Sequence, residues 1–226
     1  RRVGGAVFDA DGDRFYRLDY DPFKDHLIVS SGDETAYLQA QYLMKQDAAR
    51  YRGTAYIHTV ESDLNTGLAA ERLELTRHLA AVGDKWILLR IAWLIISARL
   101  KGIKGPRKAA LKKKLDALKK SDRFDVARFE ALEKEIDRLE AKSPAGNKDE
   151  PLRIPLAVGS EETGHNITLG HLDTADGRRI PVFCGNGLKS ALNTFAATES
   201  LLANKSPQRY AAQIAKPFAP GFKATL

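Results

Sequence analysis

The sequence is short of cysteine, because Cys184 is the only one among its 226 residues. A single cysteine cannot form an internal disulfide, which favours a reducing compartment, and we expect the protein to be cytoplasmic. No signal peptide is recognisable. The chain opens on RRVGG without a methionine, and we expect it to be a piece of a longer protein.

Long apolar runs are also missing. The most apolar segment, WILLRIAWLIISA at residues 86–98, is too short to cross a bilayer and carries Arg90 near its centre. We therefore expect a buried helix there and no membrane partner. The hydrophobic content of 43% is enough for one large domain or two small ones.

Acidic residues are scarce in one segment. Between Arg99 and Lys120 there are ten lysines and arginines against a single acid, Asp116, so this window carries more than the whole formal charge of +7. The basicity therefore belongs to one segment, which argues against nucleic acid as a partner of the molecule as a whole. The same window has no aromatic residue to stack on single-stranded bases.

Strand and helix signals alternate over residues 1–97, which indicates an α/β domain. GAVFDA at 5–10 predicts a short buried strand, and FYRLDYD at 15–21 is its expected hairpin partner. A helix should begin near Asp33, a strand should follow at 53–60, and residues 64–84 predict a helix, a strand and a Gly-Asp turn.

The α/β pattern resumes over residues 151–226. Strands are predicted within 153–160, 165–172 and 179–186. A helix is predicted at 187–203, with an apolar stripe of Leu188, Ala191, Leu192 and Phe195. Residues 206–226, with three prolines, are expected to be a linker-like tail.

Residues 98–150 differ from both flanks and predict an inserted basic antiparallel helical hairpin, followed by a flexible loop at 143–151. The second helix should be capped at Ser121 or Asp122. This insertion is either a solvated elaboration, a grip for an anionic partner, or a surface for self-association. Its expected apolar seam consists of Leu111, Leu115, Leu118, Phe129, Leu132, Ile136 and Leu139.

Three aspartates at alternate positions follow the first predicted strand, in AVFDADGDRFY at 6–16. Such carboxylates repel one another unless a cation lies between them or all face water. Alternate residues of a turn can aim their oxygens at one hard divalent cation, although the EF-hand pattern fails at Arg14 and Tyr20. A solvated acidic turn is one interpretation, and two functional ones compete with it.

The first functional interpretation is a magnesium-dependent phosphatase of the haloacid dehalogenase type. The first motif of that family is an apolar strand followed by D-x-D-G-T/V, which VFDADGD matches except at Asp13. The resemblance implies that Asp9 is the nucleophile and Asp11 the acid/base. It also requires a later lysine and a second acidic site, which VGDKWI at 82–87 supplies only in part.

The second interpretation uses the whole of DADGDR at 9–14, which resembles the D-G-D-x-D-R loop of the α-D-phosphohexomutases, the phosphoglucomutases and phosphomannomutases. The resemblance implies that Asp9, Asp11 and Asp13 bind Mg²⁺ and that Arg14 is a catalytic residue beside the phosphate. Ala10 stands where that family usually has glycine.

VGSEETGHN at 158–166 decides between the two, because it is similar to the G-E-x-S-G-H sugar-binding loop of the phosphohexomutases. A carboxylate can accept hydrogen bonds from two neighbouring sugar hydroxyls, and a histidine can serve the phosphate or a proton transfer. The resemblance implies a catalytic role for His165 and a substrate-binding loop made of Glu161, Glu162, Thr163, Gly164 and His165.

Three weaker matches fall in the family's order. VGDKWI at 82–87 resembles a substrate-facing turn and implies that Lys85 contacts a phosphate or a hydroxyl. SGDETAYLQAQYL at 31–43 and GNGLKSALNTF at 185–195 stand where the family has two helix starts. Asn186 replaces the aspartate usual in the second of these.

The resemblance implies a phosphohexomutase-type fold, a mixed sheet with flanking helices. Residues 1–20 would be the end of domain 2, residues 21–97 and 151–205 domain 3, residues 98–150 an insertion, and residues 206–226 a linker toward domain 4. The expected partners are glucose or mannose 1- and 6-phosphates, hexose 1,6-bisphosphate and the missing domains of the same protein. The phosphoserine string of domain 1 has no match, so the chain is expected to be inactive alone. A non-catalytic binding module is the remaining alternative.

Overall fold

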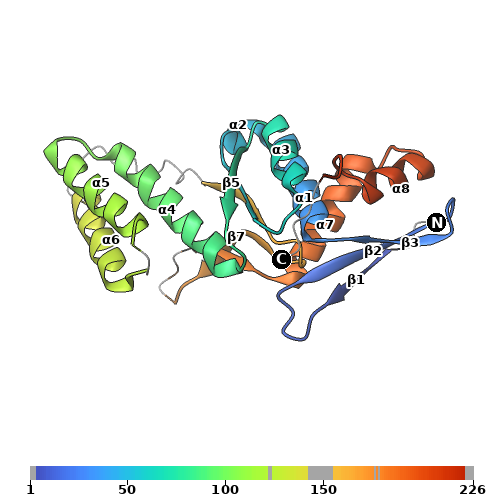
Figure 1. Cartoon of the computed structure of the whole chain (residues 1–226), viewed down its shortest axis with the longest axis horizontal. Helices are drawn as coiled ribbons and strands as arrows, with labels where there is room; N and C mark the ends of the chain where they lie inside the picture. The colour runs from blue at the N-terminus through green and yellow to red at the C-terminus, as the bar shows by residue number, and fades with distance from the viewer. Residues whose placement is uncertain (1–3, 122–123, 142–154, 176, 178, 222–226) are drawn as a thin grey trace. The chain divides into compact units, whose positions relative to one another are not determined.

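A computed structural model of the chain describes residues 4–121, 124–141, 155–175, 177 and 179–221 (Figure 1). The chain forms two compact units. The first, Arg1–Arg90 with Leu156–Leu226, is called the α/β unit below, and the second, Ile91–Pro155, is called the helical unit.

A three-stranded antiparallel sheet opens the α/β unit, in the order β1-β2-β3. Phe8 pairs with Phe15, so residues 9–14 form the turn of a hairpin, as the sequence predicts. The sequence pattern is wrong on burial, because Val7 and Phe8 of β1 are exposed, and it does not predict β3. The strands are β1 (Gly4–Phe8), β2 (Phe15–Asp21) and β3 (His26–Ser30).

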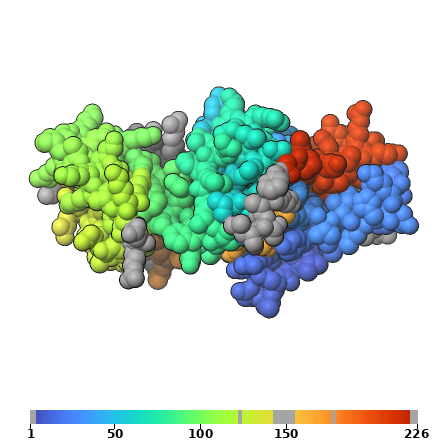
Figure 2. All heavy atoms as spheres, viewed as in Figure 1, coloured from blue at the N-terminus to red at the C-terminus, as the bar shows by residue number. Residues whose placement is uncertain are grey.

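The tail that was expected to be linker-like contains the helix α8 (Pro207–Ala215). Ser206 caps it through a hydrogen bond from the Arg209 N–H, and Pro207 occupies its first turn. Figure 2 shows α8, in orange-red, against the blue strands of the small sheet. Its buried residues pack with Ile28, Leu38 and Leu202 in one apolar cluster. The prolines therefore bound a packed helix in this segment.

The second sheet is mixed, with the order β5-β4-β6-β7-β8. Strand β4 runs parallel to β5 and β6, whereas β6-β7 and β7-β8 are antiparallel pairs. The predicted α/β class with a mixed sheet and flanking helices is confirmed. The strands are β4 (Ala55–Thr59), β5 (Thr76–Ala80), β6 (Leu156–Ser160), β7 (Asn166–Asp173) and β8 (Arg179–Gly185).

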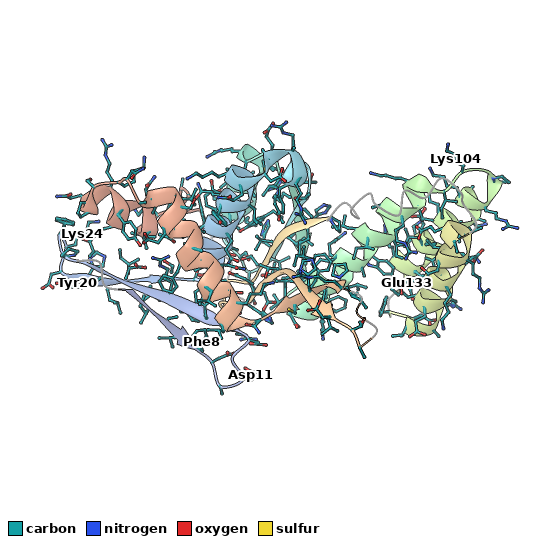
Figure 3. The ribbon with its side chains drawn as sticks, turned by 180° about the vertical axis from the view of Figure 1, so that it is seen from behind. Phe8, Asp11, Tyr20, Lys24, Lys104 and Glu133 are labelled. Carbon is teal, nitrogen blue, oxygen red and sulfur yellow. The ribbon has the colours of Figure 1, made fainter. Side chains whose placement is uncertain are left out.

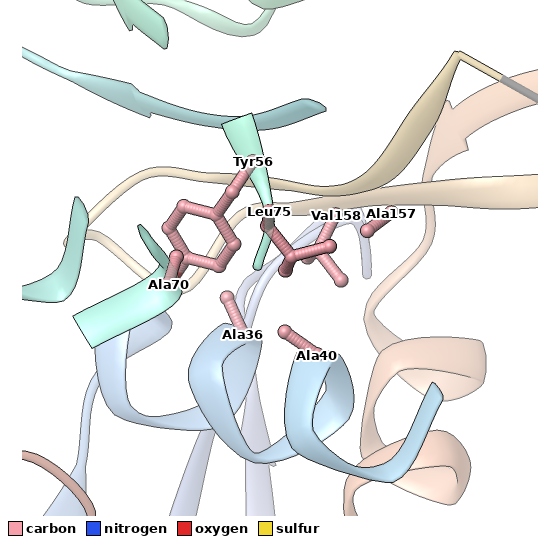
Figure 4. Packing of buried hydrophobic residues seen from close by; sticks show 7 residues of the cluster. All are labelled: Ala36, Ala40, Tyr56, Ala70, Leu75, Ala157 and Val158. Carbon is pink, nitrogen blue, oxygen red and sulfur yellow. The ribbon is translucent and has the colours of Figure 1, made fainter. Parts of the chain in front are cut away.

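Helix α1 (Gly32–Gln46) packs on this sheet through small residues (Figure 4). Ala36 and Ala40 face Tyr56 and Val158 in a buried cluster. The helix begins as the sequence predicts, because Ser31 and Glu34 form a capping box that satisfies free N–H groups of the first turn. The other helices of this unit include α2 (Ala48–Tyr51) and α3 (Leu64–Arg72).

Helix α7 (Gly187–Leu202) is where predicted, but its predicted apolar stripe is wrong. Leu188 and Leu192 are 61% and 63% exposed. The buried face carries small and hydroxyl residues, which let α7 lie close to α1 and β2. Thr194 Oγ1 donates to the Ser190 carbonyl at 2.7 Å within the helix, whereas Ser190 Oγ donates to the Asn166 carbonyl of β7 at 3.4 Å. The buried residues are Gly187, Ser190, Ala191, Thr194, Ala197, Thr198 and Leu202.

The apolar run at 86–98 lies in helix α4 (Asp84–Gly102), which begins in the α/β unit and continues into the helical unit. Ile87, Ile91 and Ile96 of α4 are buried, in agreement with the predicted helix. Among the residues described, no helix has the length and apolar character needed to span a membrane.

The helical unit contains α5 (Pro106–Lys119) and α6 (Val126–Ala141), which form the predicted hairpin. Its seam is apolar, with Leu111, Leu115, Leu118, Leu132 and Ile136 buried. The predicted cap is wrong at Ser121, which follows Lys120, the C-cap of α5. The start of α6 is satisfied by Asp125, whose carboxylate accepts from the Arg128 N–H at 3.0 Å. Asp122 and the loop at 143–151 lie outside the described residues.

Candidate functional site

The aspartate loop, residues 9–14, is a tight turn between β1 and β2. The Gly12 N–H donates to the Asp9 carbonyl at 3.2 Å, and Gly12 has φ +74°, which glycine adopts without strain. One carboxylate oxygen from each of Asp9, Asp11 and Asp13 lies within 4.8 Å of the others. Figure 3 shows Asp11 at the tip of the hairpin.

The charges within the aspartate loop shift the pKa values of two carboxyls in opposite directions. Desolvation and the nearby charges of Asp11 and Asp9 raise the pKa of Asp13, against the opposing effect of His165. Desolvation also acts to raise the pKa of Asp9, but hydrogen bonds led by the Arg14 N–H lower it overall. Asp9 therefore ionises more readily than Asp13.

The aspartate loop has the chemistry of a hard-cation site. The Asp13 Oδ1 atom is buried and accepts no hydrogen bond, and the nearest guanidinium nitrogen, Arg14 Nε, is 3.8 Å away. The same nitrogen lies 3.8 Å from Asp9 Oδ2. Three carboxylates that converge from alternate residues of a turn match the oxygen ligands that Mg²⁺ prefers. The residues present therefore fit a magnesium ion.

The sugar loop, residues 161–165, connects β6 to β7 and is bonded to the residue that follows the aspartate loop. The Phe15 N–H donates to the Gly164 carbonyl at 3.2 Å. Gly164 has φ +91°, and a Cβ added to it would lie 2.6 Å from the Phe15 carbonyl oxygen. Only glycine allows the sugar loop to approach this closely.

A chain of polar contacts runs from the aspartate loop through the sugar loop to the turn at 82–85. Asp13 Oδ2 lies 3.9 Å from His165 Nε2, and His165 Nδ1 lies 3.9 Å from Glu161 Oε2. The Gly83 N–H donates to Glu161 Oε1 at 2.6 Å. Glu161 and His165 are only 5% and 3% exposed. Three segments that are far apart in the sequence therefore converge on one place.

The start of α7 also holds the aspartate loop. The Gly187 N–H donates to the Gly12 carbonyl at 2.9 Å, and a Cβ on Gly187 would lie 2.5 Å from the Arg14 carbonyl oxygen. A Cβ on Gly185 would overlap the imidazole of His165. The sequence predicts only a helix start here, because these glycines act through residues distant in the chain.

The remaining predicted residues are more peripheral. The side chain of Arg14 is 44% exposed, and Thr163 and Lys85 are exposed. The Lys85 ammonium lies 5.5 Å from the centre of the Trp86 ring, so its described contacts are local. Glu162 is half-buried and accepts a hydrogen bond from Ser31 Oγ at 2.8 Å, at the start of α1.

Two buried residues that were not predicted as site residues fix the sugar loop against α1. Asn166 Oδ1 accepts from Thr35 Oγ1 at 3.0 Å and from Gln39 Nε2 at 2.8 Å. Asp33 accepts from Ser160 Oγ at 2.7 Å, and its burial raises its pKa. Gly32 belongs to the same contact, because its Cβ would overlap the Glu161 carbonyl oxygen. In the sequence, the Gly-Asp pair at 32–33 that starts α1 was the signal that could have indicated this contact.

Residues 31–93 match the family described as phosphoglucomutase/phosphomannomutase, alpha/beta/alpha domain III. This match confirms the resemblance to the phosphohexomutases for that segment, which contains α1 and the turn at 82–85. No curated protein matches the chain.

Several solved structures resemble this chain at low sequence identity. One is N-acetylglucosamine-phosphate mutase in its substrate complex, with 10% identity over 93% of this chain and 25% of that one, at a TM-score of 0.39. A phosphoglucomutase/phosphomannomutase family protein from Burkholderia thailandensis has 17% identity over 96% of this chain and 47% of that one, at a TM-score of 0.33. An apo form of N-acetylglucosamine-phosphate mutase has 13% identity over 89% of this chain and 49% of that one, at a TM-score of 0.34. The chain thus spans between a quarter and about half of these proteins.

Proposed function

We propose that this chain, whose residues 31–93 match phosphohexomutase domain III, is the magnesium- and sugar-binding part of a phosphoglucomutase/phosphomannomutase-type enzyme. Such an enzyme interconverts hexose 1-phosphates and 6-phosphates through a phosphoserine and a hexose 1,6-bisphosphate. The proposal includes a cytoplasmic location and the expected order of domains, with residues 98–150 as an insertion in domain 3.

The observation that carries the proposal is the contact chain Asp13–His165–Glu161–Gly83. It joins the aspartate loop, the sugar loop and the turn at 82–85, the three segments that a phosphohexomutase would direct at one substrate. A solvated acidic turn would have no need of a buried histidine and a buried glutamate beside it.

Each residue then has a chemical task. Asp9, Asp11 and Asp13 would hold Mg²⁺, which when bound neutralises charge on a transferring phosphoryl group. Arg14 adds a fixed cation whose fork matches phosphate oxygens. Glu161 accepts hydrogen bonds from sugar hydroxyls, and Thr163 adds a hydroxyl at the exposed side of the same loop.

His165 lies 3.9 Å from a carboxylate oxygen of Asp13 and 3.9 Å from one of Glu161, which places its imidazole where it can serve a phosphate oxygen or a proton transfer. The exposed Lys85 supplies a mobile cation at the edge of the site. The alternative of an aspartyl-nucleophile phosphatase requires none of the contacts between the aspartate loop and the sugar loop, and no observation favours it.

The experiment is calorimetric titration of glucose 1-phosphate and mannose 1-phosphate into the chain with MgCl₂ present. Glu161→Gln should weaken binding at least about tenfold, because a neutral amide accepts more weakly from hydroxyls than a carboxylate. Glu130→Gln is the matched control, since Glu130 is exposed on α6 and pairs only loosely with Lys134 at 3.9 Å. Equal affinity in the wild type and in Glu161→Gln would contradict the proposal.

A coupled mutase assay tests the second half of the proposal. Because no phosphoserine string is present in the sequence, the isolated chain should convert no hexose phosphate, with or without added hexose 1,6-bisphosphate. Measurable conversion would contradict this part, while leaving the binding role to the titration.

A further inference from the structure

A cavity of about 410 Å³ lies in the α/β unit, walled by α1, α2 and α7 and floored by β6 and β7. It shares no lining residue with the aspartate loop, the sugar loop or the turn at 82–85. Its volume falls in the range of small-molecule sites. It is therefore separate from the candidate site described above.

Two of the residues that line the cavity carry a buried side-chain oxygen without a hydrogen-bond partner. These are Thr168 Oγ1 on β7 and Gln39 Oε1 on α1, whose residues are 6% and 3% exposed. The orientation of the Gln39 amide is fixed, because its Nε2 donates to Asn166 Oδ1 and Asn166 Nδ2 in turn donates to the Gly32 carbonyl. Gln39 Oε1 can only accept, so it calls for a donor such as a hydroxyl.

The charged groups of the lining are all basic. Lys189 is half-buried and donates to the Leu169 carbonyl, and burial lowers its pKa. Arg50 is the second charged group, His171 adds an imidazole, and no aspartate or glutamate among the described residues lines the cavity. Tyr42 and Tyr51 supply aromatic surface, with the Arg50 guanidinium 5.7 Å from the centre of the Tyr51 ring. An anion would be attracted here, and a cation repelled.

We propose that this cavity is a second ligand site, which binds a small hydroxylated anion of the size of a hexose phosphate. Hydroxyl groups of the ligand satisfy Gln39 Oε1 and Thr168 Oγ1, while Lys189 and Arg50 bind the anionic group. The shared chemistry fits a sugar phosphate or a sugar acid, and the probes below separate these two sources.

The test is a calorimetric titration of glucose 6-phosphate, gluconate, glucose and inorganic phosphate in the Glu161→Gln background, in which binding at the sugar loop is weakened. Glucose 6-phosphate or gluconate should still bind to the cavity in this variant. Thr168→Val, which keeps the shape of the side chain, should weaken that binding about tenfold through the lost hydrogen bond. Lys189→Met should weaken it at least as much, because it removes a charge-assisted contact.

Thr76→Val is the matched control, since Thr76 is on β5 and its hydroxyl donates to the Gly53 carbonyl at 3.1 Å, away from the cavity lining. It should leave the affinity unchanged. The proposal is overturned if neither glucose 6-phosphate nor gluconate binds in the Glu161→Gln background. It is also overturned if Thr168→Val binds as tightly as its parent, or if inorganic phosphate alone binds as tightly as both sugar probes. Because the sugar-loop site is weakened beforehand and shares no lining residue with the cavity, failure here is independent of the proposed mutase role.

Discussion

The two units of the molecule place their charges differently. The α/β unit buries Arg17, Asp33, Glu161 and His165, each within a network of hydrogen bonds or ion pairs. The seam of the helical unit is purely apolar, and the ion pairs on its surface involve exposed carboxylates, such as Glu135 with Lys114. Buried charges cost desolvation energy that only a full set of partners offsets. Their concentration in the α/β unit shows that this unit fixes its strands and loops through buried polar networks.

The largest effect should come from the buried ion pair of Arg17 with Asp19, whose Nε–Oδ2 distance is 2.6 Å. Arg17→Met should lower the free energy of unfolding by about 3–5 kcal/mol, because the Asp19 carboxylate is left buried and unpaired. Urea unfolding measures the change. Lys114→Met, which removes the exposed pair with Glu135, should cost less than about 1 kcal/mol. An equal loss of unfolding free energy in Arg17→Met and Lys114→Met would contradict the difference between the two units.

The next largest effect should come from the seam of the helical unit. Leu115 is almost fully buried, so Leu115→Ala should cost about 2–4 kcal/mol of unfolding free energy through lost packing and the cavity left behind. Because none of the described residues of the helical unit belongs to the candidate site, glucose 1-phosphate affinity should stay unchanged in this variant. A loss of affinity would show that the site depends on the insertion. Urea unfolding and calorimetry on the same sample give both readouts.

A smaller effect on stability, but a large one on binding, should follow from Gly185→Ala. The added methyl group would overlap His165, so the imidazole has to move, at a cost of about 1–3 kcal/mol. Hexose phosphate affinity should fall with it. Gly170→Ala is the control, because its Cβ would meet Val182 at an ordinary 3.4 Å. Unchanged affinity in Gly185→Ala would mean that the position of His165 is not required.

The smallest effect concerns Asp13, whose raised pKa means that folding favours its protonated form. The ionised carboxylate therefore costs stability at neutral pH, and this cost vanishes as the pH falls below the ordinary value of 3.8. Without Mg²⁺, Asp13→Asn should stabilise the chain by a few tenths of a kcal/mol, roughly what an exposed charge pair is worth.

Mg²⁺ should reverse the sign of that difference, because the wild type then gains a ligand that the variant loses. Thermal unfolding at pH 7, with and without MgCl₂, measures the change. Asp116→Asn on α5 is the control and should respond to neither condition. If Mg²⁺ stabilised Asp13→Asn as much as the wild type, the aspartate loop would not be the site that binds it.

Local pattern was enough to predict most of the elements. The leucine spacing of 111–118 predicts the hairpin, and the capping signal at Ser31 predicts the start of α1. The stripe on α7 was mispredicted because burial there depends on how closely α1 and β2 approach, which favours Ser190 and Thr194 over Leu188. The three prolines of residues 206–226 predict a linker, whereas helix α8 depends on the packing of Tyr210 with Ile28, which no local pattern shows.

The candidate site likewise has a part that the sequence predicts and a part that only the structure shows. Motif order indicates Asp13, Glu161 and His165, and the structure brings them within ion-pair distance. The close approaches at Gly185 and Gly187 involve residues twenty and more than 170 positions away in the chain, respectively, so no local pattern could reveal them.

The most direct test of the central claim is phosphorus NMR of glucose 1-phosphate mixed with the chain and Mg²⁺, followed over hours. The proposed role predicts an intact sugar phosphate whose resonance broadens on adding protein and broadens less when Glu161→Gln replaces the wild type. Release of inorganic phosphate that disappears in Asp9→Ala would contradict it and favour an aspartyl-nucleophile phosphatase. A resonance that stays sharp at every protein concentration would contradict it as well.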